Sequence, residues 1–323
     1  MPIVESPYTA PFWLRNGHTQ TMWPVLFRKI DILPAQRVRL ATPDDDFIDV
    51  DIMRAATSPV RRAVILSHGL EGNTRRKYMQ GMAKILLRNG WDVVARHLRG
   101  CSEEMNRQPG QYHMGATEDV HTVVQYCVAQ GYDTLALAGF SMGGSQTLKY
   151  LGEAPQRVPP QVQAAVAISV PCDLVGASRK LASPACAVYM IYFMRTMHKK
   201  MRIKAAMHKD FPSIDNLERI RTFDVFDEHF TAPINGFRSA MDYWTQSGCG
   251  QFLQNIRIPA LLLNAADDPF MTPSCFPWDV ARRSPWLTLE VPAHGGHVGF
   301  VTTTPAYWSE LRAAAYLHDI FGR

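Results

Sequence analysis

The sequence lacks a run of eighteen or more apolar residues, so it predicts no membrane-spanning helix. The first residues carry neither a basic stretch nor an apolar core, and we therefore expect no signal peptide. Internal repeats and low-complexity tracts are also missing. With 323 residues, of which 46% are hydrophobic and 20% charged, the composition is that of a soluble globular protein. Such a length suits one large α/β domain with an insertion, or two ordinary domains.

The six cysteines are scattered, and no two of them form a CxxC pair. Cys101, Cys127 and Cys172 lie in or beside core-like segments, where a thiol behaves as a small apolar group. We therefore expect neither disulfides nor a zinc site. Thiols of this kind stay reduced in the cytoplasm, which is the location that the cysteine usage predicts.

The charge balance shows only a small excess of one sign. Lys and Arg number 34 against 29 Asp and Glu, which gives a net charge of +5. An excess this mild and dispersed does not predict nucleic-acid binding. It is compatible with weak attraction to a membrane surface or to an anionic substrate. The sequence does not indicate an oligomeric state.

Short apolar runs alternate with helix-like stretches along most of the chain. Runs of this kind suit strands that are buried on both faces of a parallel sheet. The alternation therefore predicts an α/β fold with a doubly wound, mostly parallel sheet. We expect the buried strands at residues 63–67, 91–95, 135–138, 164–170, 260–264 and 287–291.

The alternation is interrupted between about residues 173 and 250, where helix-like segments occur without a clear buried strand. An insertion there would lie over the carboxyl ends of the strands, where open α/β sheets bind ligands. We predict a helical cap insertion at 173–250, and a core formed by 61–172 and 251–323. Residues 1–60 are expected to form an N-terminal segment whose apolar side chains lie on the core, with an antiparallel edge hairpin at 36–55.

Four methionines recur at helical spacing inside the predicted cap, and three interpretations of them are open. They pack against the body, line an acyl pocket, or form part of a lipid-facing patch; we favour packing, although methionine also adapts well to flexible acyl chains. The methionines are Met190, Met194, Met197 and Met201, and we interpret the basic residues nearby as a solvated face: Arg195, Lys199, Lys200, Arg202 and Lys204.

A G-x-S-x-G pattern at 139–143 directly follows the apolar run at 135–138 and precedes a helix-like run at 144–151. This pattern places a serine on a sharp strand-to-helix turn and lifts its hydroxyl above the sheet. The turn is strained, and the flanking glycines allow the strand and the helix to approach closely. Ser141 is therefore the candidate nucleophile.

A serine hydroxyl is a weak nucleophile and needs a base, which an acid holds in the right tautomer. In this type of fold the acid and then the base follow the serine, on loops after later strands. Asp268 and His297 occupy such loops. The neighbouring Asp267 and His294 are the alternatives. We favour Asp268 because a proline follows it, and His297 because glycines flank it.

An oxyanion hole needs two backbone N–H donors. One is expected from Met142, directly after the candidate nucleophile, and the other from the loop at 68–72, where we assign Leu70. His68 in that loop could instead be taken for a catalytic base. A histidine in a His-Gly turn more often orders its loop by hydrogen bonding, and we favour this interpretation.

Six motifs together resemble those of the YheT-like branch of the α/β-hydrolases, and the similarity extends from about residue 10 to residue 318. The resemblance implies a carboxylic-ester hydrolase that needs no cofactor and no metal, with Ser141, Asp268 and His297 as its triad. The motifs are SHGLEG at 67–72, RGCS at 99–102, YH at 112–113, GFSMGG at 139–144, ADDP at 266–269 and GGHVGF at 295–300, and WLRNGHTQT at 13–21 resembles the N-terminal signature of the branch.

The expected partner is a small-molecule ester, either a short- to medium-chain acyl ester or a lipid-derived one. Two classes of alternative remain. The same triad could serve a thioesterase, an amidase or an acyltransferase, and the fold could also be that of a non-catalytic lipid-binding module.

Overall fold

A nine-stranded sheet forms the centre of the computed structural model, which describes residues 2–56 and 61–322. The strand order is β1-β9-β8-β7-β6-β4-β5-β3-β2. Neighbouring strands are parallel from β1 to β5 in this order. At the other edge, β3 pairs antiparallel with β5, and β2 pairs antiparallel with β3. The strands are β1 (Ile3–Val4), β2 (Gln36–Ala41), β3 (Phe47–Met53), β4 (Arg62–Ser67), β5 (Asp92–Arg96), β6 (Thr134–Phe140), β7 (Val162–Ile168), β8 (Ala260–Leu263) and β9 (Leu287–Glu290).

The predicted fold class is confirmed, because each predicted buried strand overlaps a strand of the sheet. The pair β2–β3 forms the antiparallel hairpin that was expected at the edge. Strand β1 was not predicted, since its two residues are too few to show an apolar pattern. The predicted end of the N-terminal segment at residue 60 lies outside the described residues.

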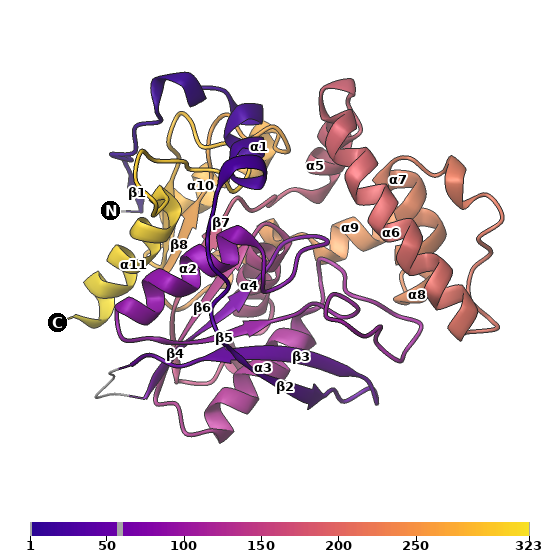
Figure 1. The fold of residues 1–323 in the computed structure, drawn as a ribbon, viewed down its shortest axis with the longest axis horizontal. Coiled ribbons are helices and arrows are strands. Elements are labelled where there is room, and N and C mark those ends of the chain that lie inside the picture. Colours follow the sequence, from indigo (N-terminus) through magenta and orange to yellow (C-terminus); the bar gives the residue numbers. More distant parts are fainter. Residues whose placement is uncertain (1, 57–60, 323) are drawn as a thin grey trace.

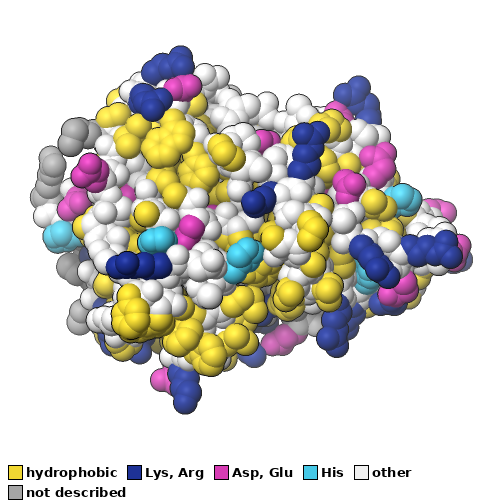
Figure 2. All heavy atoms as spheres, turned by 90° about the horizontal axis from the view of Figure 1, so that it is seen from above, with side chains coloured by type: hydrophobic (Ala, Val, Ile, Leu, Met, Phe, Trp, Pro, Cys, Tyr) yellow, Lys and Arg dark blue, Asp and Glu magenta, His cyan; other side chains and the backbone are white. Residues whose placement is uncertain are grey.

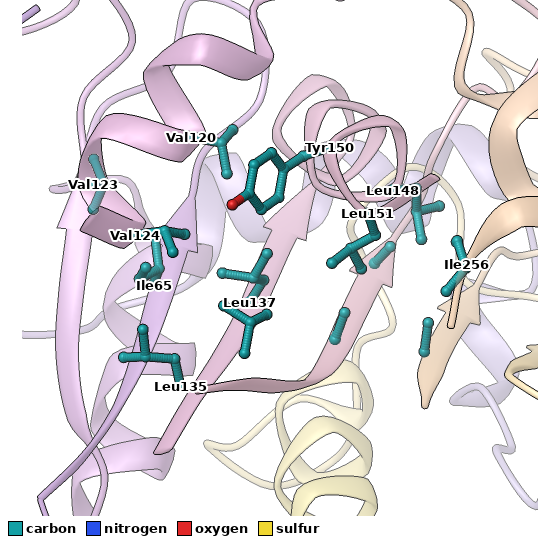
Figure 3. Close-up of a cluster of buried hydrophobic side chains, with 14 of the residues drawn as sticks. Ile65, Val120, Val123, Val124, Leu135, Leu137, Leu148, Tyr150, Leu151 and Ile256 are labelled. Carbon is teal, nitrogen blue, oxygen red and sulfur yellow. The ribbon is translucent and has the colours of Figure 1, made fainter. Parts of the chain in front are cut away.

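Helices cover both faces of the sheet (Figure 1), because successive strand residues point to opposite faces and both sets are apolar. Ile65 of β4 belongs to a cluster with side chains of α3 and α4, part of which Figure 3 shows. Its neighbour Leu66 belongs to a second cluster, with side chains of α2 and α11. The helices are α1 (Gly17–Phe27), α2 (Lys77–Arg88), α3 (Thr117–Ala129), α4 (Met142–Glu153), α5 (Leu174–Leu181), α6 (Ala187–Met207), α7 (Phe223–Phe226), α8 (Ala232–Ile234), α9 (Ala240–Ser247), α10 (Trp278–Arg283) and α11 (Trp308–Phe321).

The segment 173–250 contains α5 to α9 and forms a lobe beside the sheet (Figure 1). It leaves the sheet after β7 and returns before β8. Its four methionines pack mainly inside the lobe, in a cluster with apolar side chains that come later in the same segment. Of the four, only Met197 also lines the cavity described below. The other buried members of this cluster are Leu217, Ile220, Phe223, Phe226 and Phe230.

Apolar side chains of the N-terminal segment were expected to lie on the core, which is confirmed for Leu14 and Trp23 but wrong for the end of helix α1. Gly17, Gln20 and Pro24 are buried, whereas Leu26 and Phe27 are mostly exposed. The reason lies in the close contact of helix α1 with the loop that carries Asp267. A Cβ atom on Gly17 would meet the carbonyl oxygen of Asp267 at 1.8 Å, so that only glycine permits the approach.

All six cysteines are buried and carry free thiols, which confirms the core-like positions predicted for Cys101, Cys127 and Cys172. Among the residues that the structure describes, no helix combines the length and the apolar character that crossing a membrane requires.

Candidate active site

Ser141 lies on the turn between β6 and α4, at a φ of 51° and a ψ of −118°. Residues other than glycine rarely adopt such a backbone conformation, which costs about 1–3 kcal/mol. The flanking glycines are required by space. A Cβ atom on Gly139 would lie 2.4 Å from the carbonyl oxygen of Gly143, and one on Gly143 would lie 2.5 Å from that of Ser67. The strained turn therefore holds the serine at the end of the strand, on the wall of a cavity.

His297 and Asp268 lie side by side, with Nδ1 of the imidazole 2.8 Å from Oδ2 of the carboxylate. Asp268 is buried, and its second oxygen accepts a hydrogen bond of 2.9 Å from the backbone N–H of Phe270. A carboxylate at Nδ1 favours the tautomer that carries its proton there, so Nε2 is free to accept one. His297 lines the same cavity as Ser141.

Asp267 occupies a different place from its neighbour Asp268. Its Oδ2 lies 3.3 Å from Nδ1 of His294, and its Oδ1 accepts a hydrogen bond of 2.8 Å from the backbone N–H of Gly296. The two adjacent carboxylates thus hold different parts of one loop. Asp268 contacts the imidazole of His297, and Asp267 contacts the main chain of the residue before this histidine, Gly296.

Helix α1 supports the same loop, which the sequence analysis did not foresee. The backbone N–H of His297 donates to Oγ1 of Thr21 over 2.9 Å, and that of Val301 donates to Oε1 of Gln20 over 2.9 Å. The signal was present in the motif at 13–21, where a run of mostly polar residues follows Trp13 and Leu14. Its meaning was hidden because the partners are 276 and 281 positions away in the chain.

The loop with His68 passes beside Ser141. A Cβ atom on Gly69 would lie 3.2 Å from Cβ of Ser141, and Leu70 and Met142 both line the cavity. Both ring nitrogens of His68 are engaged: Nδ1 lies 2.7 Å from the carbonyl oxygen of Gly69, and Nε2 accepts from the N–H of Leu98 over 3.1 Å. Burial holds the pKa of His68 well below its usual range. A neutral imidazole with these contacts orders the loop.

Glu71, the residue after Leu70, connects this loop to α6. Its φ of 53° is unusual for a glutamate. Its buried carboxylate lies 2.7 Å from Nζ of Lys200 and accepts a hydrogen bond from the hydroxyl of Tyr112. Arg76 adds a second link, because its guanidinium donates to the carbonyl oxygen of Glu71 and to the hydroxyl of Tyr192 in α6, over 2.9 Å and 2.6 Å.

Lys200 and Lys204 show that the interpretation of these basic residues as a solvated face was wrong in part. Burial disfavours the Lys200 ammonium, but the neighbouring Cys101 and Glu71 outweigh this effect and raise its pKa. Lys204 is buried and donates to the carbonyl oxygen of Asn106 over 2.8 Å. Burial lowers the pKa of Lys204 to about 8. Both lysines anchor α6 to the body, whereas the other three basic residues are exposed.

A cavity of about 610 Å³ lies between the core and the lobe 173–250, and its walls are mostly apolar. Its volume is within the range of pockets that enclose most of a small organic ligand. Glu71 and Asp227 place buried carboxyls in its wall, and that of Asp227 accepts hydrogen bonds from Thr231 and from the indole N–H of Trp244, over 2.6 Å and 2.8 Å. Burial raises the pKa of Asp227 to about 6. In the described part of the chain, His, Cys, Asp and Glu form no cluster of three or more that could hold a metal ion.

Several known proteins with similar sequences are named as esterases or lipases. Residues 58–284 match a protein family described as "Serine aminopeptidase, S33". The "Putative esterase YheT" of Escherichia coli is 32% identical over 94% of this chain and 90% of that protein. The human "Phospholipase ABHD3" is 27% identical over 99% of this chain and 78% of that protein. Among solved structures, an esterase of Pyrococcus furiosus has the same fold, with a TM-score of 0.59 and 16% identity over 90% of this chain and 98% of that chain.

Proposed function

Because the chain belongs to the α/β-hydrolase superfamily, in its YheT-like branch, and is a carboxylic-ester hydrolase, we propose that it cleaves its substrate through an acyl-enzyme on Ser141. One observation carries this proposal. The strained Ser141 shares a cavity wall with His297, whose Nδ1 faces the buried carboxylate of Asp268. This arrangement supports a nucleophile, a base and an acid in the order that the fold requires.

The proposed reaction has two halves. Ser141 Oγ attacks the ester carbonyl carbon while Nε2 of His297 takes the hydroxyl proton, and Asp268 stabilises the imidazolium that forms. The imidazolium then gives this proton to the leaving alcohol. In the second half His297 deprotonates a water molecule, which attacks the acyl carbon, and the acid is released as Ser141 recovers its proton.

The negative charge on the substrate oxygen needs donors in both halves of the reaction. We assign the backbone N–H groups of Leu70 and Met142 to this role, supported by their position on the cavity wall and by the close passage of Gly69 beside Ser141. One such donor is typically worth about 2.7–4 kcal/mol of transition-state stabilisation.

The proposed substrate is a short- to medium-chain acyl ester or a lipid-derived ester. The apolar cavity supports an acyl chain as its main occupant, and segment 173–250, which supplies much of its wall, is proposed as the cap. Related proteins named "Phospholipase ABHD3" and "Monoacylglycerol lipase" support the lipid-derived class.

The length of the acyl chain tests this substrate class. We expect kcat/KM for p-nitrophenyl esters to rise up to about fourfold for each added methylene, since each buried methylene contributes about 0.8 kcal/mol. The increase should stop once the cavity is filled. Esters from acetate to palmitate are measured under identical conditions. A kcat/KM that is flat or falls from acetate onward would contradict an apolar acyl site.

Amide hydrolysis is the second candidate, since the matching family is described as an aminopeptidase family. The same acyl groups presented as p-nitroanilides separate the two activities. Ester hydrolysis predicts kcat/KM values for the anilides that are far below those of the matched esters. Comparable values would favour an amidase on the same residues.

The ion pair between Lys200 of α6 and Glu71 of the loop at 68–72 leads to a further prediction. Lys200→Met is expected to lower kcat about tenfold with little change in KM, because removing one of the contacts of Glu71 loosens the Leu70 N–H and loses part of the stabilisation that one donor supplies. Steady-state kinetics on p-nitrophenyl butyrate checks it. Lys200→Arg should restore much of kcat, since a guanidinium also pairs with the carboxylate.

Lys204→Met is the matched control for this experiment. Lys204 is also a buried lysine of α6 bound to the body, but its partners are the carbonyl oxygens of Asn106 and Gln108 rather than a residue of the loop at 68–72. This variant should lose stability and keep kcat. If both variants lose kcat equally, the tie to Glu71 has no specific role in positioning the loop.

A further inference from the structure

Large apolar side chains are exposed together on α1 and α6, on the face that Figure 2 shows from above. Isolated exposed apolar residues are common, but a contiguous group of them indicates a site of interaction. We call this group the apolar face. Its members and exposed fractions are Val25 (62%), Leu26 (60%), Phe27 (59%), Val188 (66%), Ile191 (70%) and Tyr192 (45%).

The two halves of the apolar face meet at the mouth of the cavity. Val25, Val188 and Tyr192 contribute to the cavity wall as well as to the face. The helices that carry them are linked there, because Nδ1 of His18 in α1 lies 3.1 Å from the hydroxyl of Tyr189 in α6. The face is therefore continuous with the opening that leads toward Ser141.

Packing inside the protein does not account for these exposed residues. Helix α6 already buries Met190, Met194, Met197 and Met201 on its inner side. Helix α1 docks through Gly17, Gln20 and Pro24. The exposed apolar residues lie on the outer sides of both helices, where the folded chain leaves them in contact with water.

The two helices that carry the apolar face have no negatively charged side chain of their own, since neither α1 nor α6 contains an aspartate or a glutamate. Along the exposed side of α6, Val188 and Tyr192 are followed by Arg195 and Lys199 at the spacing of a single helical stripe. An apolar region bordered by basic side chains is typical of helices that lie at the headgroup boundary of a membrane.

We propose that the apolar face docks on an anionic lipid surface, with the cavity mouth turned toward the lipid. Basic residues are attracted to anionic headgroups, and apolar residues at their side enter the acyl boundary. The absence of acidic residues on both helices favours lipid over a basic protein partner. A hydrophobic path then leads from the bilayer into the cavity. This inference rests on exposure and charge alone, and it holds whether or not Ser141 is the nucleophile.

Vesicle co-sedimentation tests the docking. The Ser141→Ala protein is used so that the vesicles are not hydrolysed. We expect the fraction bound to vesicles of phosphatidylcholine and phosphatidylglycerol to exceed the fraction bound to pure phosphatidylcholine by about fivefold or more. Raising the salt concentration should weaken this binding, because salt screens exposed charges. Equal binding to both kinds of vesicle, or binding to neither, would overturn the proposal.

Substitutions on the face make the test specific. Leu26→Asp combined with Ile191→Asp should lower vesicle binding about tenfold or more, since both side chains enter the lipid. Neither residue lines the cavity. On the otherwise unmodified enzyme, the same pair should leave hydrolysis of water-soluble p-nitrophenyl acetate unchanged, which shows that the fold is intact.

Met241→Asp combined with Leu311→Asp is the matched control, because these residues are 48% and 40% exposed outside the face. Vesicle binding by this variant should equal that of the parent protein. Equal losses in both double variants would overturn the proposal. So would a concentration-dependent dimer that the Leu26 and Ile191 substitutions dissolve without any change in vesicle binding, because the face would then bind a second copy of the chain.

Discussion

Ser141→Ala is expected to lower kcat for p-nitrophenyl butyrate by about 10⁴-fold or more, because the acyl-enzyme cannot form without the hydroxyl. The substitution keeps the Cβ atom, so the backbone strain at a φ of 51° is unchanged and the fold should survive. Steady-state kinetics measures the loss, and the thermal unfolding midpoint checks the fold.

Labelling with a fluorophosphonate gives an independent measurement of the same residue. The parent protein should take up one label per chain on Ser141, and Ser141→Ala should take up none. Ser178→Ala is a fitting control, since Ser178 also lines the cavity but lies on α5. It should keep both labelling and activity. A Ser141→Ala protein that retains more than about 1% of kcat would rule out the proposed nucleophile.

Asp268→Asn is expected to lower kcat by about 10⁴-fold, a second effect of similar size. The reason is a change of tautomer. The N–H of Phe270 donates to Oδ1 of Asp268, so it holds the carbonyl oxygen of the new amide there and turns the amide NH₂ toward Nδ1 of His297. The imidazole must then carry its proton on Nε2, where it cannot accept one from Ser141. Kinetics across the pH range measures the loss.

Asp267→Asn provides the comparison, because the two aspartates are adjacent and of equal size. Asp267 contacts His294 and the N–H of Gly296 rather than the imidazole of His297. We expect its substitution to lower kcat by about tenfold at most, through a looser loop. The reverse order of the two effects would show that Asp267 is the acid.

Much of the fold could be predicted from local patterns in the sequence. The six buried strands are continuous apolar runs, which parallel sheets covered on both faces require. The candidate triad could be located because each member follows a recognisable strand. The preference for Asp268 over Asp267 depended on the following proline alone, and only the three-dimensional structure separates the contacts of the two residues.

Other parts of the site could not be predicted, because they depend on contacts between distant positions. Lys200 and Glu71 are 129 positions apart, and each alone resembles a surface residue in the sequence. Helix α1 poses a different difficulty. Its apolar pattern does not say whether the partner of Leu26 and Phe27 is the protein itself or something outside it, and the structure leaves both side chains exposed.

The tie between Lys200 and Glu71 has a consequence for the timing of events in a catalytic cycle. Helix α6 forms part of the cavity wall, so widening the entrance by moving this helix outward must break the ion pair. The strained Glu71 would then lose one of the partners that hold it beside Leu70, while its hydrogen bond with Tyr112 could stay. Opening the cavity by this route would therefore weaken the support of the Leu70 loop at the moment when a substrate enters.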